Sequence, residues 1–288
     1  MAMQTGTFRG FVISIERPGI VLITLDRPER LNSMTAAMKR DLMEVLLEAQ
    51  LDDEVRVVVF TGNGRAFCAG DDIGPQTEPQ GEGQALARPL PPGHGHPLGT
   101  YAALRAISQA LNLTVRQLDK PTIAAINGWA IQSGLSLALA CDFRIASRQA
   151  RLGSGTLRFA LMPDEGGHYF LVQVLGVAKA VDFILRNRIV SAEEALALGL
   201  VHEVVEPQEL LPRAMALAQE LCQGPQVAMR LLKRAIYNAA EMGMLQAFDD
   251  IAARTALSDH HPDAQEGVRA FREKRAPRFN RWLEEAGG

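Results

Sequence analysis

The chain has 288 residues, of which 47% are apolar, and its 30 basic and 33 acidic side chains leave a formal net charge of −3. This length and apolar content suffice for one α/β domain with a helical appendage. Because acidic and basic side chains are nearly equal in number, the chain lacks the large positive net charge that would attract nucleic acid or an anionic membrane surface. The 3 cysteines, Cys68, Cys141 and Cys222, are odd in number and widely spaced, so they predict neither a disulfide framework nor a zinc site. Because residues 1–8 lack a signal-peptide pattern and no apolar run is long enough to span a bilayer, we expect a cytoplasmic protein.

The first part of the chain alternates strand and helix patterns. Two β-branched runs, residues 11–16 and 20–25, flank the turn sequence RPG and predict a hairpin. In MTAAMKRDLMEVLLEAQLDD the apolar residues recur at helical spacing, and Thr35 is the expected N-cap. The next segment, VRVVVFTG, is almost continuously apolar, which is typical of a strand that is covered on both faces.

The same order of elements recurs in the middle of the chain. KPTIAAIN has the pattern of a second buried strand, and SGLSLALAC has that of a short helix. DFRIAS and ARLGS follow as two further strands. A repeated strand–turn–helix unit predicts a stacked or spiral α/β core.

Two other segments differ from this core in composition. Residues 74–99 are rich in proline and glycine, which excludes a long regular element and predicts a loop that is either functional or disordered. Beyond residue 206 the apolar residues follow helical stripes, in 207–222, 225–240 and 243–257. We therefore expect a core over residues 1–205 and a helical C-terminal domain over residues 206–288, which needs a partner surface to cover its apolar stripes.

Two turns combine glycine with exposed backbone. In FCAGDDI, Gly70 follows an apolar strand, and glycine both allows unusual backbone angles and lets a ligand approach the main chain. In AINGWAIQSGLSLALA, a strand and a loop lead into a helix that begins near Ser133 and Gly134, where the first amides have no internal partner. The amide of Asp71 and the first amides of this helix can converge on one oxygen as an oxyanion hole. The alternative is that both segments are ordinary strand–helix turns.

Six segments occur in the order and spacing of one known family: DRPERLNSM, GRAFCAGDDI, KPTIAAINGWAIQSGLSLALACDFRIAS, LMPDEGG, SAEEALALGLVHEVV and EGVRAFREKRAPRF. Through these segments the chain resembles the crotonase superfamily, which is also called the enoyl-CoA hydratase/isomerase family. The resemblance extends from about residue 10 to residue 280. The resemblance implies an α/β fold, a crotonase-like spiral of ββα units with a helical C-terminal domain, that forms a homotrimer or a dimer of trimers. It implies an acyl-CoA thioester substrate, with no metal, no cofactor beyond the substrate's own coenzyme A, and no nucleic-acid or membrane partner. By motif position, the amides that hold the thioester oxygen are those of Asp71 and Ser133.

The sequence departs from the family where hydratases carry their paired glutamates. The resemblance maps these two positions to Ser136 and Thr156, which we keep as substrate-contacting residues although a hydroxyl is a poor base. A carboxylate occurs instead at Asp164, where dienoyl-CoA and some enoyl-CoA isomerases of the superfamily have an aspartate that moves a proton. Asp164 also precedes an expected helix over residues 166–175, so N-capping is its alternative role. For Glu165 we expect a solvent-facing or first-turn position.

The remaining candidates would contact coenzyme A or the acyl group. The resemblance and the position beside the two turns assign substrate-binding roles to Arg27, Arg30, Ala69, Gly70, Trp129, Gly134, Phe271 and Lys274. The family's counterpart of Lys274 reaches coenzyme A from the C-terminal domain, in some members across a subunit boundary. For the charged residues the alternative is a solvated surface charge, and for Trp129 it is core packing. Weaker catalytic candidates are His94, His96 and His168.

The pattern as a whole favours double-bond isomerisation of an enoyl-CoA with Asp164 as the base, because this reaction needs one well-placed carboxylate rather than two. An apolar wall from Phe159, Leu161 and Met162 is expected to desolvate Asp164 and raise its pKa. Two alternatives stay open. One is hydration with non-standard acid and base residues, and the other is a coenzyme A-binding scaffold that has lost its catalytic glutamates.

Overall fold

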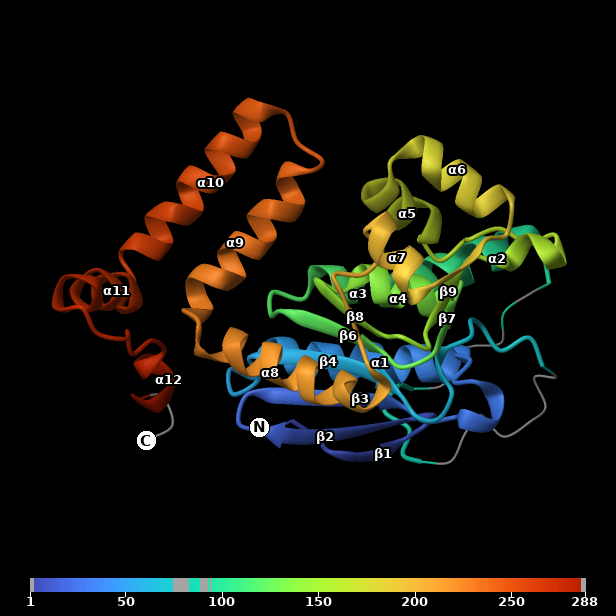
Figure 1. Cartoon of the computed structure of the whole chain (residues 1–288), viewed down its shortest axis with the longest axis horizontal. Coiled ribbons are helices and arrows are strands. Elements are labelled where there is room, and N and C mark those ends of the chain that lie inside the picture. Colours follow the sequence, from blue (N-terminus) through green and yellow to red (C-terminus); the bar gives the residue numbers. More distant parts are fainter. Residues whose placement is uncertain (1–2, 75–82, 89–92, 94, 286–288) are drawn as a thin grey trace.

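A computed structural model describes residues 3–74, 83–88, 93 and 95–285, which form two β-sheets surrounded by helices (Figure 1). The larger sheet has seven strands in the order β1 (Gly6–Phe8), β2 (Phe11–Arg17), β3 (Ile20–Leu25), β4 (Val57–Gly62), β6 (Thr122–Ile126), β8 (Phe143–Ser147) and β11 (Glu203–Val205). The smaller sheet has four in the order β10 (Ile189–Ser191), β9 (Arg151–Gly153), β7 (Trp129–Ile131) and β5 (Ala66–Cys68).

Successive strands alternate between the two sheets, which makes the core a spiral. The consecutive pairs β4–β5, β6–β7 and β8–β9 each place their first strand in the larger sheet and their second in the smaller one. From β3 to β11 the larger sheet is parallel, whereas β1, β2 and β3 pair antiparallel. The predicted α/β class and spiral order are confirmed.

The central strands are buried on both faces, as their continuous apolar pattern predicts. Val58 and Phe60 of β4 belong to the main core, while Val57 and Val59 point to the other face of the sheet. There they pack with helix α8 (Leu210–Gln223), through residues that include Leu210, Ala214 and Ala218. Because both faces are covered, each strand contributes side chains to two apolar layers.

Several local predictions are confirmed by the helices. Thr35 caps α1 (Ala36–Leu51), since its side chain accepts a 3.1 Å hydrogen bond from the Met38 amide. Helix α4 (Ser133–Ala140) begins where the sequence predicts, and its eight residues are all buried. Further helical segments are η1 (Pro28–Arg30), η3 (Thr156–Phe159), α5 (Gly167–Leu175), α6 (Val177–Leu185), α7 (Ala192–Leu198) and η4 (Pro207–Glu209).

Two predictions about loops are wrong. The expected loop over residues 74–99 ends early, because Pro97 opens a helical segment made of α2 (Pro97–Ala103), the π-helix η2 (Leu104–Ser108) and α3 (Gln109–Gln117). Proline suits the first turn of a helix, where its missing amide is not needed. Residues 129–131, expected as a loop, form the three-residue strand β7, which pairs in parallel with β5 on one side and β9 on the other.

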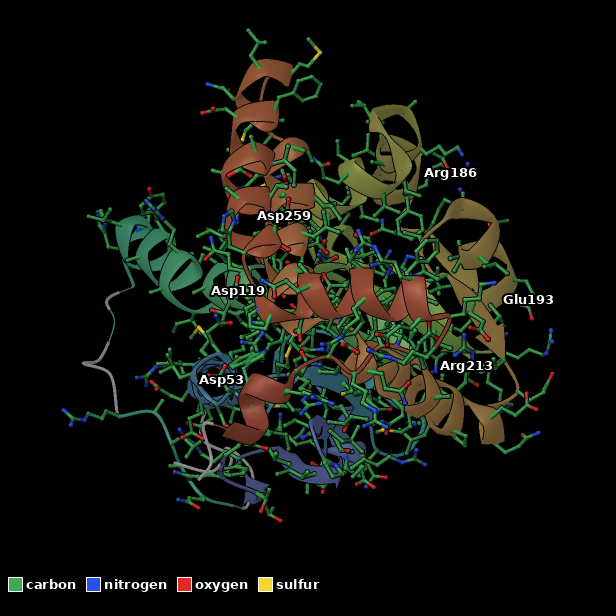
Figure 2. All side chains as sticks on the ribbon, turned by 90° about the vertical axis from the view of Figure 1, so that its left-hand side faces the viewer. Asp53, Asp119, Arg186, Glu193, Arg213 and Asp259 are labelled. Atoms are coloured by element: carbon green, nitrogen blue, oxygen red, sulfur yellow. The ribbon has the colours of Figure 1, made fainter. Side chains whose placement is uncertain are left out.

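All described residues after β11 that form regular elements are helical. Beyond α8 these are α9 (Gln226–Ala239), α10 (Met244–Asp259), α11 (Pro262–Glu273) and α12 (Arg281–Glu285). In Figure 1, α10 and α11 extend to the end of the molecule opposite β7 and β9. The base of α9 is tied to the core by ion pairs from Arg230 to Asp53 at 2.9 Å and from Arg234 to Asp119 at 3.7 Å, two aspartates labelled in Figure 2. The division at residue 206 stays a prediction. In the described part of the chain, no helix combines the length and apolar character needed to cross a membrane.

Candidate active site

Two glycines bring the turns after β5 and β7 into contact. A Cβ atom on Gly134, the second residue of α4, would lie 2.0 Å from the carbonyl oxygen of Cys68, at the end of β5. Gly70 adopts φ +114°, which L side chains avoid, and an added Cβ there would lie 3.5 Å from the Ile131 carbonyl oxygen. The start of α4 therefore packs directly on the chain that leaves β5.

The backbone on either side of this contact leaves two amides without acceptors. The Met34 amide donates to the Gly70 carbonyl at 2.9 Å, and the Met34 carbonyl accepts from the Asp72 amide at 3.0 Å. These bonds hold the residues on either side of Asp71 and do not use the Asp71 amide. The Asp71 N–H has no acceptor within the described residues. Ser133 is the first residue of α4, and its N–H lies in the turn that a helix leaves unpaired.

The side chain of Asp71 connects the two turns. The Ser133 hydroxyl donates to Asp71 Oδ1 at 2.5 Å, and Lys39 Nζ lies 2.8 Å from Asp71 Oδ2. Lys39 is buried on α1 and also donates to the Ser108 hydroxyl at 2.9 Å. This chain of contacts fixes the position of Asp71 relative to Ser133, and hence the spacing of their amides.

Both amide-bearing residues line a cavity of about 520 Å³. Seven residues singled out from the sequence share its wall: Arg30, Ala69, Gly70, Asp71, Ser133, Thr156 and Asp164. The buried Thr156 hydroxyl has no hydrogen-bond partner among the described residues, so it is available to a bound molecule. Phe159, Leu161 and Met162 supply apolar surface to the same wall.

Asp164 is half-buried on this wall and does not cap a helix. Helix α5 has Gly166 as its N-cap and receives no side-chain capping bond, so the helix-cap interpretation of Asp164 is wrong. Burial raises the pKa of the Asp164 carboxyl, and the negative charge of Asp71 raises it further, while Lys39 opposes the change. A carboxylate with a raised pKa at a cavity wall is suited to accept a proton.

Glu165 is buried rather than solvent-facing, so the prediction for this residue is wrong. Only 2% of it is exposed, and its Oε1 accepts from Gln132 Nε2 at 2.8 Å and from the Ser136 hydroxyl at 2.5 Å. Gly167 permits this approach, because a Cβ there would lie 2.5 Å from Ser136 Oγ. Desolvation raises the pKa of the Glu165 carboxyl.

Other predicted residues lie away from the cavity wall. Arg27 is buried, and its guanidinium donates to the Ser33 carbonyl at 2.6 Å and to Asp72 at 2.8 Å. Trp129 is 40% exposed at the start of β7 and does not line the cavity. Phe271 and Lys274 lie at the end of α11, at the far side of the molecule, and Phe271 is 86% exposed.

The histidines that the structure describes do not gather at the site. His96 caps α2 by accepting from the Leu98 amide, and His168 Nδ1 lies 3.2 Å from the Pro163 carbonyl oxygen rather than beside the Asp164 carboxylate. His94 lies outside the described residues. Within the described ranges, His, Cys, Asp and Glu side chains form no group of three or more that could hold a metal ion.

Sequence reasoning missed Lys39, Gln132 and the burial of Glu165. Gln132 adopts φ +48° just before α4, a conformation uncommon for a residue with a side chain, and it links Glu165 to the Ser154 hydroxyl at 2.9 Å. The glycine pair after Glu165 was the available signal, since adjacent glycines at a helix start indicate close packing. Lys39 carries no such signal, because it resembles any charged residue beside an apolar helical stripe.

Comparison with known proteins gives consistent matches over nearly the whole chain. The family described as enoyl-CoA hydratase/isomerase matches residues 16–90 and 93–282. The 1,2-epoxyphenylacetyl-CoA isomerase of Escherichia coli (strain K12) is 35% identical over 274 residues, which cover 93% of this chain and 98% of that protein. The (E)-benzylidenesuccinyl-CoA hydratase of Thauera aromatica is 32% identical over 261 residues, 90% of this chain and 95% of that protein. The crystal structure of an enoyl-CoA hydratase from Bacillus anthracis is 32% identical, with a TM-score of 0.83 over 94% of this chain and 98% of that one.

Proposed function

Because the chain belongs to the enoyl-CoA hydratase/isomerase family, which acts on CoA thioesters, we propose that it moves the double bond of an unsaturated acyl-CoA. The observation that carries the proposal is the Asp164 carboxylate on the same cavity wall as Asp71 and Ser133. The two positions that resemble the hydratase glutamates hold Ser136 and Thr156, neither of which is a carboxylic acid. A single base suffices for isomerisation, whereas hydration of a 2-enoyl thioester uses a paired acid and base.

In the proposed reaction, the thioester oxygen accepts hydrogen bonds from the Asp71 and Ser133 amides. Asp164 removes a proton from the α-carbon of a 3-enoyl-CoA, and the electron pair of that C–H bond delocalises onto the thioester oxygen as a dienolate. Returning the proton to the γ-carbon completes the shift to a 2-enoyl-CoA. Each amide donor to the developing charge is worth about 3 kcal/mol. No oxidation state changes and no water is consumed, so the step itself requires no metal or redox cofactor.

Hydration is the second candidate, and one observation favours it. Glu165 lies beside Asp164 on the same wall, so the site has two carboxyl groups even though they do not occupy the positions expected for a hydratase. One of the relatives is also named as a hydratase. A water-adding reaction would need one carboxyl to activate water and the other to protonate the α-carbon.

A panel of thioesters separates the two reactions. The protein is incubated with 2-enoyl-, 3-enoyl- and dienoyl-CoA esters of different chain length and with aryl-substituted esters, and products are followed by ultraviolet absorbance and mass. Isomerisation changes the absorbance of the thioester without changing its mass, whereas hydration adds the mass of one water. We expect the first result with a 3-enoyl or dienoyl ester. Water addition to 2-enoyl-CoA as the fastest reaction would favour hydration, and no reaction with any ester would favour a binding scaffold.

We further propose that the chain works as a homotrimer, or a dimer of trimers, in the cytoplasm. Large apolar side chains on the C-terminal helices are exposed, including Leu232, Leu245, Phe248, Leu257 and Phe271. Large apolar side chains that are exposed on one chain are suited to burial in an interface between subunits. Sedimentation at micromolar concentration is expected to give three or six times 31.4 kDa, and a stable species of 31.4 kDa would contradict the proposal. In such an assembly, Phe271 and Lys274 would contact coenzyme A bound to a neighbouring subunit.

A further inference from the structure

One oxygen of the Glu165 carboxyl group has two hydrogen-bond donors. Gln132 Nε2 and the Ser136 hydroxyl both donate to Oε1, at 2.8 Å and 2.5 Å, and both come from the start of α4. The amide oxygen of Gln132 in turn accepts from the Ser154 hydroxyl at 2.9 Å, which holds the amide in this orientation. Oε1 is therefore arranged as an acceptor, and a proton on this carboxyl group belongs on Oε2.

The surroundings of Glu165 favour a neutral carboxyl group. The residue is 2% exposed, and among the described residues no lysine, arginine or histidine forms an ion pair with it. Burying an ionised carboxylate without a cation is unfavourable, so such a group keeps its proton. The raised pKa of Glu165 agrees with this geometry.

Charged groups on the neighbouring elements do not reverse this preference. The charged residues that line the candidate cavity with Glu165 are Arg30, Asp71, Asp72, Arg158 and Asp164. Lys39 pairs with Asp71, and Arg27 pairs with Asp72. Glu165 also lines a second cavity of about 760 Å³ on its other side. The charged or titratable residues of that cavity are Arg105, Arg116, Asp142, Arg144, His168, Tyr169, Tyr237 and Glu241. Arg116 packs on the rings of Phe170 and Tyr237, and Arg144 donates to backbone carbonyls, so neither is directed at the Glu165 carboxyl.

We infer that Asp164 and Glu165 form a carboxyl pair that holds one proton, in which neutral Glu165 donates a hydrogen bond from Oε2 to the Asp164 carboxylate. The two residues are adjacent in the chain and line the same cavity wall, and the negative charge of Asp164 contributes to the raised pKa of Glu165. Glu165 is then a positioning residue, because it directs the Asp164 carboxylate and keeps it ionised without carrying a second negative charge. The inference rests on the proposed role of Asp164 as the base. The inference also assigns a role to Ser136, whose hydroxyl would orient the neutral Glu165 carboxyl group.

The inferred hydrogen bond would account for how Asp164 stays ionised beside another acid. Two ionised carboxylates in contact repel each other, and a pair in this situation commonly shares one proton. With the proton on Glu165, the pair carries one negative charge, located on the member that borders the cavity. During turnover, Asp164 gains the substrate proton and passes it to the γ-carbon, while the Glu165 proton stays in place.

Glu165→Gln is the matched variant, because a glutamine has the same shape, accepts at Oε1 and donates from Nε2, as the neutral glutamic acid does from Oε2. We expect this variant to keep turnover within about threefold of the wild type and to leave the pH profile of kcat/KM nearly unchanged. Glu165→Leu, which fills the same space without a donor, is expected to lose roughly tenfold or more in kcat with a smaller change in KM. Thermal unfolding and CoA-ester affinity serve as controls for folding. If Glu165→Gln loses as much turnover as Asp164→Asn, or if Glu165→Leu retains wild-type turnover, the inference is wrong.

Infrared spectroscopy tests the location of the proton without any turnover, so its outcome does not depend on whether the protein is an isomerase. A neutral carboxyl group has a C=O stretch that ionised carboxylates lack. At pH 7, the difference spectrum of wild type minus Glu165→Gln is expected to contain this band, and Asp164→Asn is expected to retain it. Absence of the band from the wild type would overturn the inference. Its loss in Asp164→Asn but not in Glu165→Gln would place the proton on Asp164 and would overturn it equally.

Discussion

One part of the cavity wall presents backbone amides, at Asp71 and Ser133, and another part presents side chains, at Thr156, Asp164 and Glu165. The amide part is fixed by close backbone contacts, since Gly134 lies against the Cys68 carbonyl and leaves no room for a Cβ atom. The side-chain part is held by hydrogen bonds between polar groups, such as those from Ser136 and Gln132 to Glu165. A single substitution changes the chemistry of the second part without altering the backbone, whereas the first part changes only if the chain moves.

This difference separates two aspects of the function. Amides that bind a thioester oxygen serve any reaction that passes through an enolate, so in the proposed mechanism the first part of the wall would determine the class of substrate. In the same mechanism, the identity and protonation of the carboxyl groups would decide where a proton goes, so the second part would determine the reaction. Related proteins named as an isomerase and as a hydratase are compatible with a shared first part and different second parts.

The largest effect is expected from a Cβ atom in the amide part. In Gly134→Ala the new atom would meet the Cys68 carbonyl oxygen at 2.0 Å, so the start of α4 must move away from β5. We expect kcat/KM to fall by roughly 100- to 1,000-fold as the two amides separate. The free energy of unfolding should fall by about 1–3 kcal/mol from overpacking.

Gly155→Ala is the matched control for this variant. Gly155 lines the same cavity with φ −125°, and its added Cβ would have Ile131 Cγ2 as nearest neighbour at 3.7 Å, an ordinary contact. Steady-state kinetics and denaturant unfolding of the two variants make the comparison. Equal effects from both glycines would mean that the contact between α4 and β5 has no special role.

The next largest effect is expected in the side-chain part. Asp164→Asn keeps the size of the side chain but cannot accept a proton, so turnover should fall by about 100-fold or more while CoA-ester affinity stays similar. Ser136→Ala and Thr156→Ala should have smaller effects, because neither hydroxyl is a base. Turnover assays and calorimetry distinguish the two quantities. Wild-type turnover by Asp164→Asn would remove Asp164 from the mechanism.

The smallest effect concerns stability at different pH. The folded-state pKa of Glu165 lies above its ordinary value of 4.5, because burial disfavours the ionised form. From pH 4.5 up to the folded-state pKa, Glu165 binds a proton more fully in the folded protein than in the unfolded chain. The contribution of Glu165 to the free energy of unfolding therefore falls as the pH rises through this interval. Glu165→Gln removes this contribution, and its unfolding free energy should decline less steeply with pH than that of the wild type. Denaturant unfolding across a pH series measures both slopes, and identical slopes would contradict the burial of an ionisable group at this position.

The elements that could be predicted from the sequence are those with a strong local pattern. The hairpin of β2 and β3, the Thr35 cap of α1 and the doubly buried β4 and β6 follow from periodicity, turn residues and capping chemistry. The three-residue strand β7 is too short to have a pattern of its own, and it forms by pairing with β5 on one side and β9 on the other. The helical segment from α2 to α3 follows a proline- and glycine-rich stretch whose composition favours a loop.

The site shows the same dependence on local signals. The glycines at positions 70 and 134 indicate close approach of backbone, and the residues beside them do line one cavity. Glu165 was misjudged because two adjacent acids before glycines resemble an exposed turn. Its burial depends on Gln132 and Ser136, which lie about 30 positions earlier in the sequence. Lys39 pairs with Asp71 across a similar separation, and no local pattern indicates such a contact.

The most direct test of the central claim is exchange of the α-proton of a bound thioester. A 3-enoyl-CoA is incubated in deuterated buffer with the wild type, Glu165→Gln and Asp164→Asn, and the α- and γ-positions are followed by proton NMR. We predict that the wild type and Glu165→Gln move hydrogen between these two carbons, and that Asp164→Asn does so about 100-fold more slowly or not at all. Exchange by Asp164→Asn at the wild-type rate, or no proton transfer by the wild type with a thioester that it binds, would contradict the role of Asp164 as the base beside the two amides.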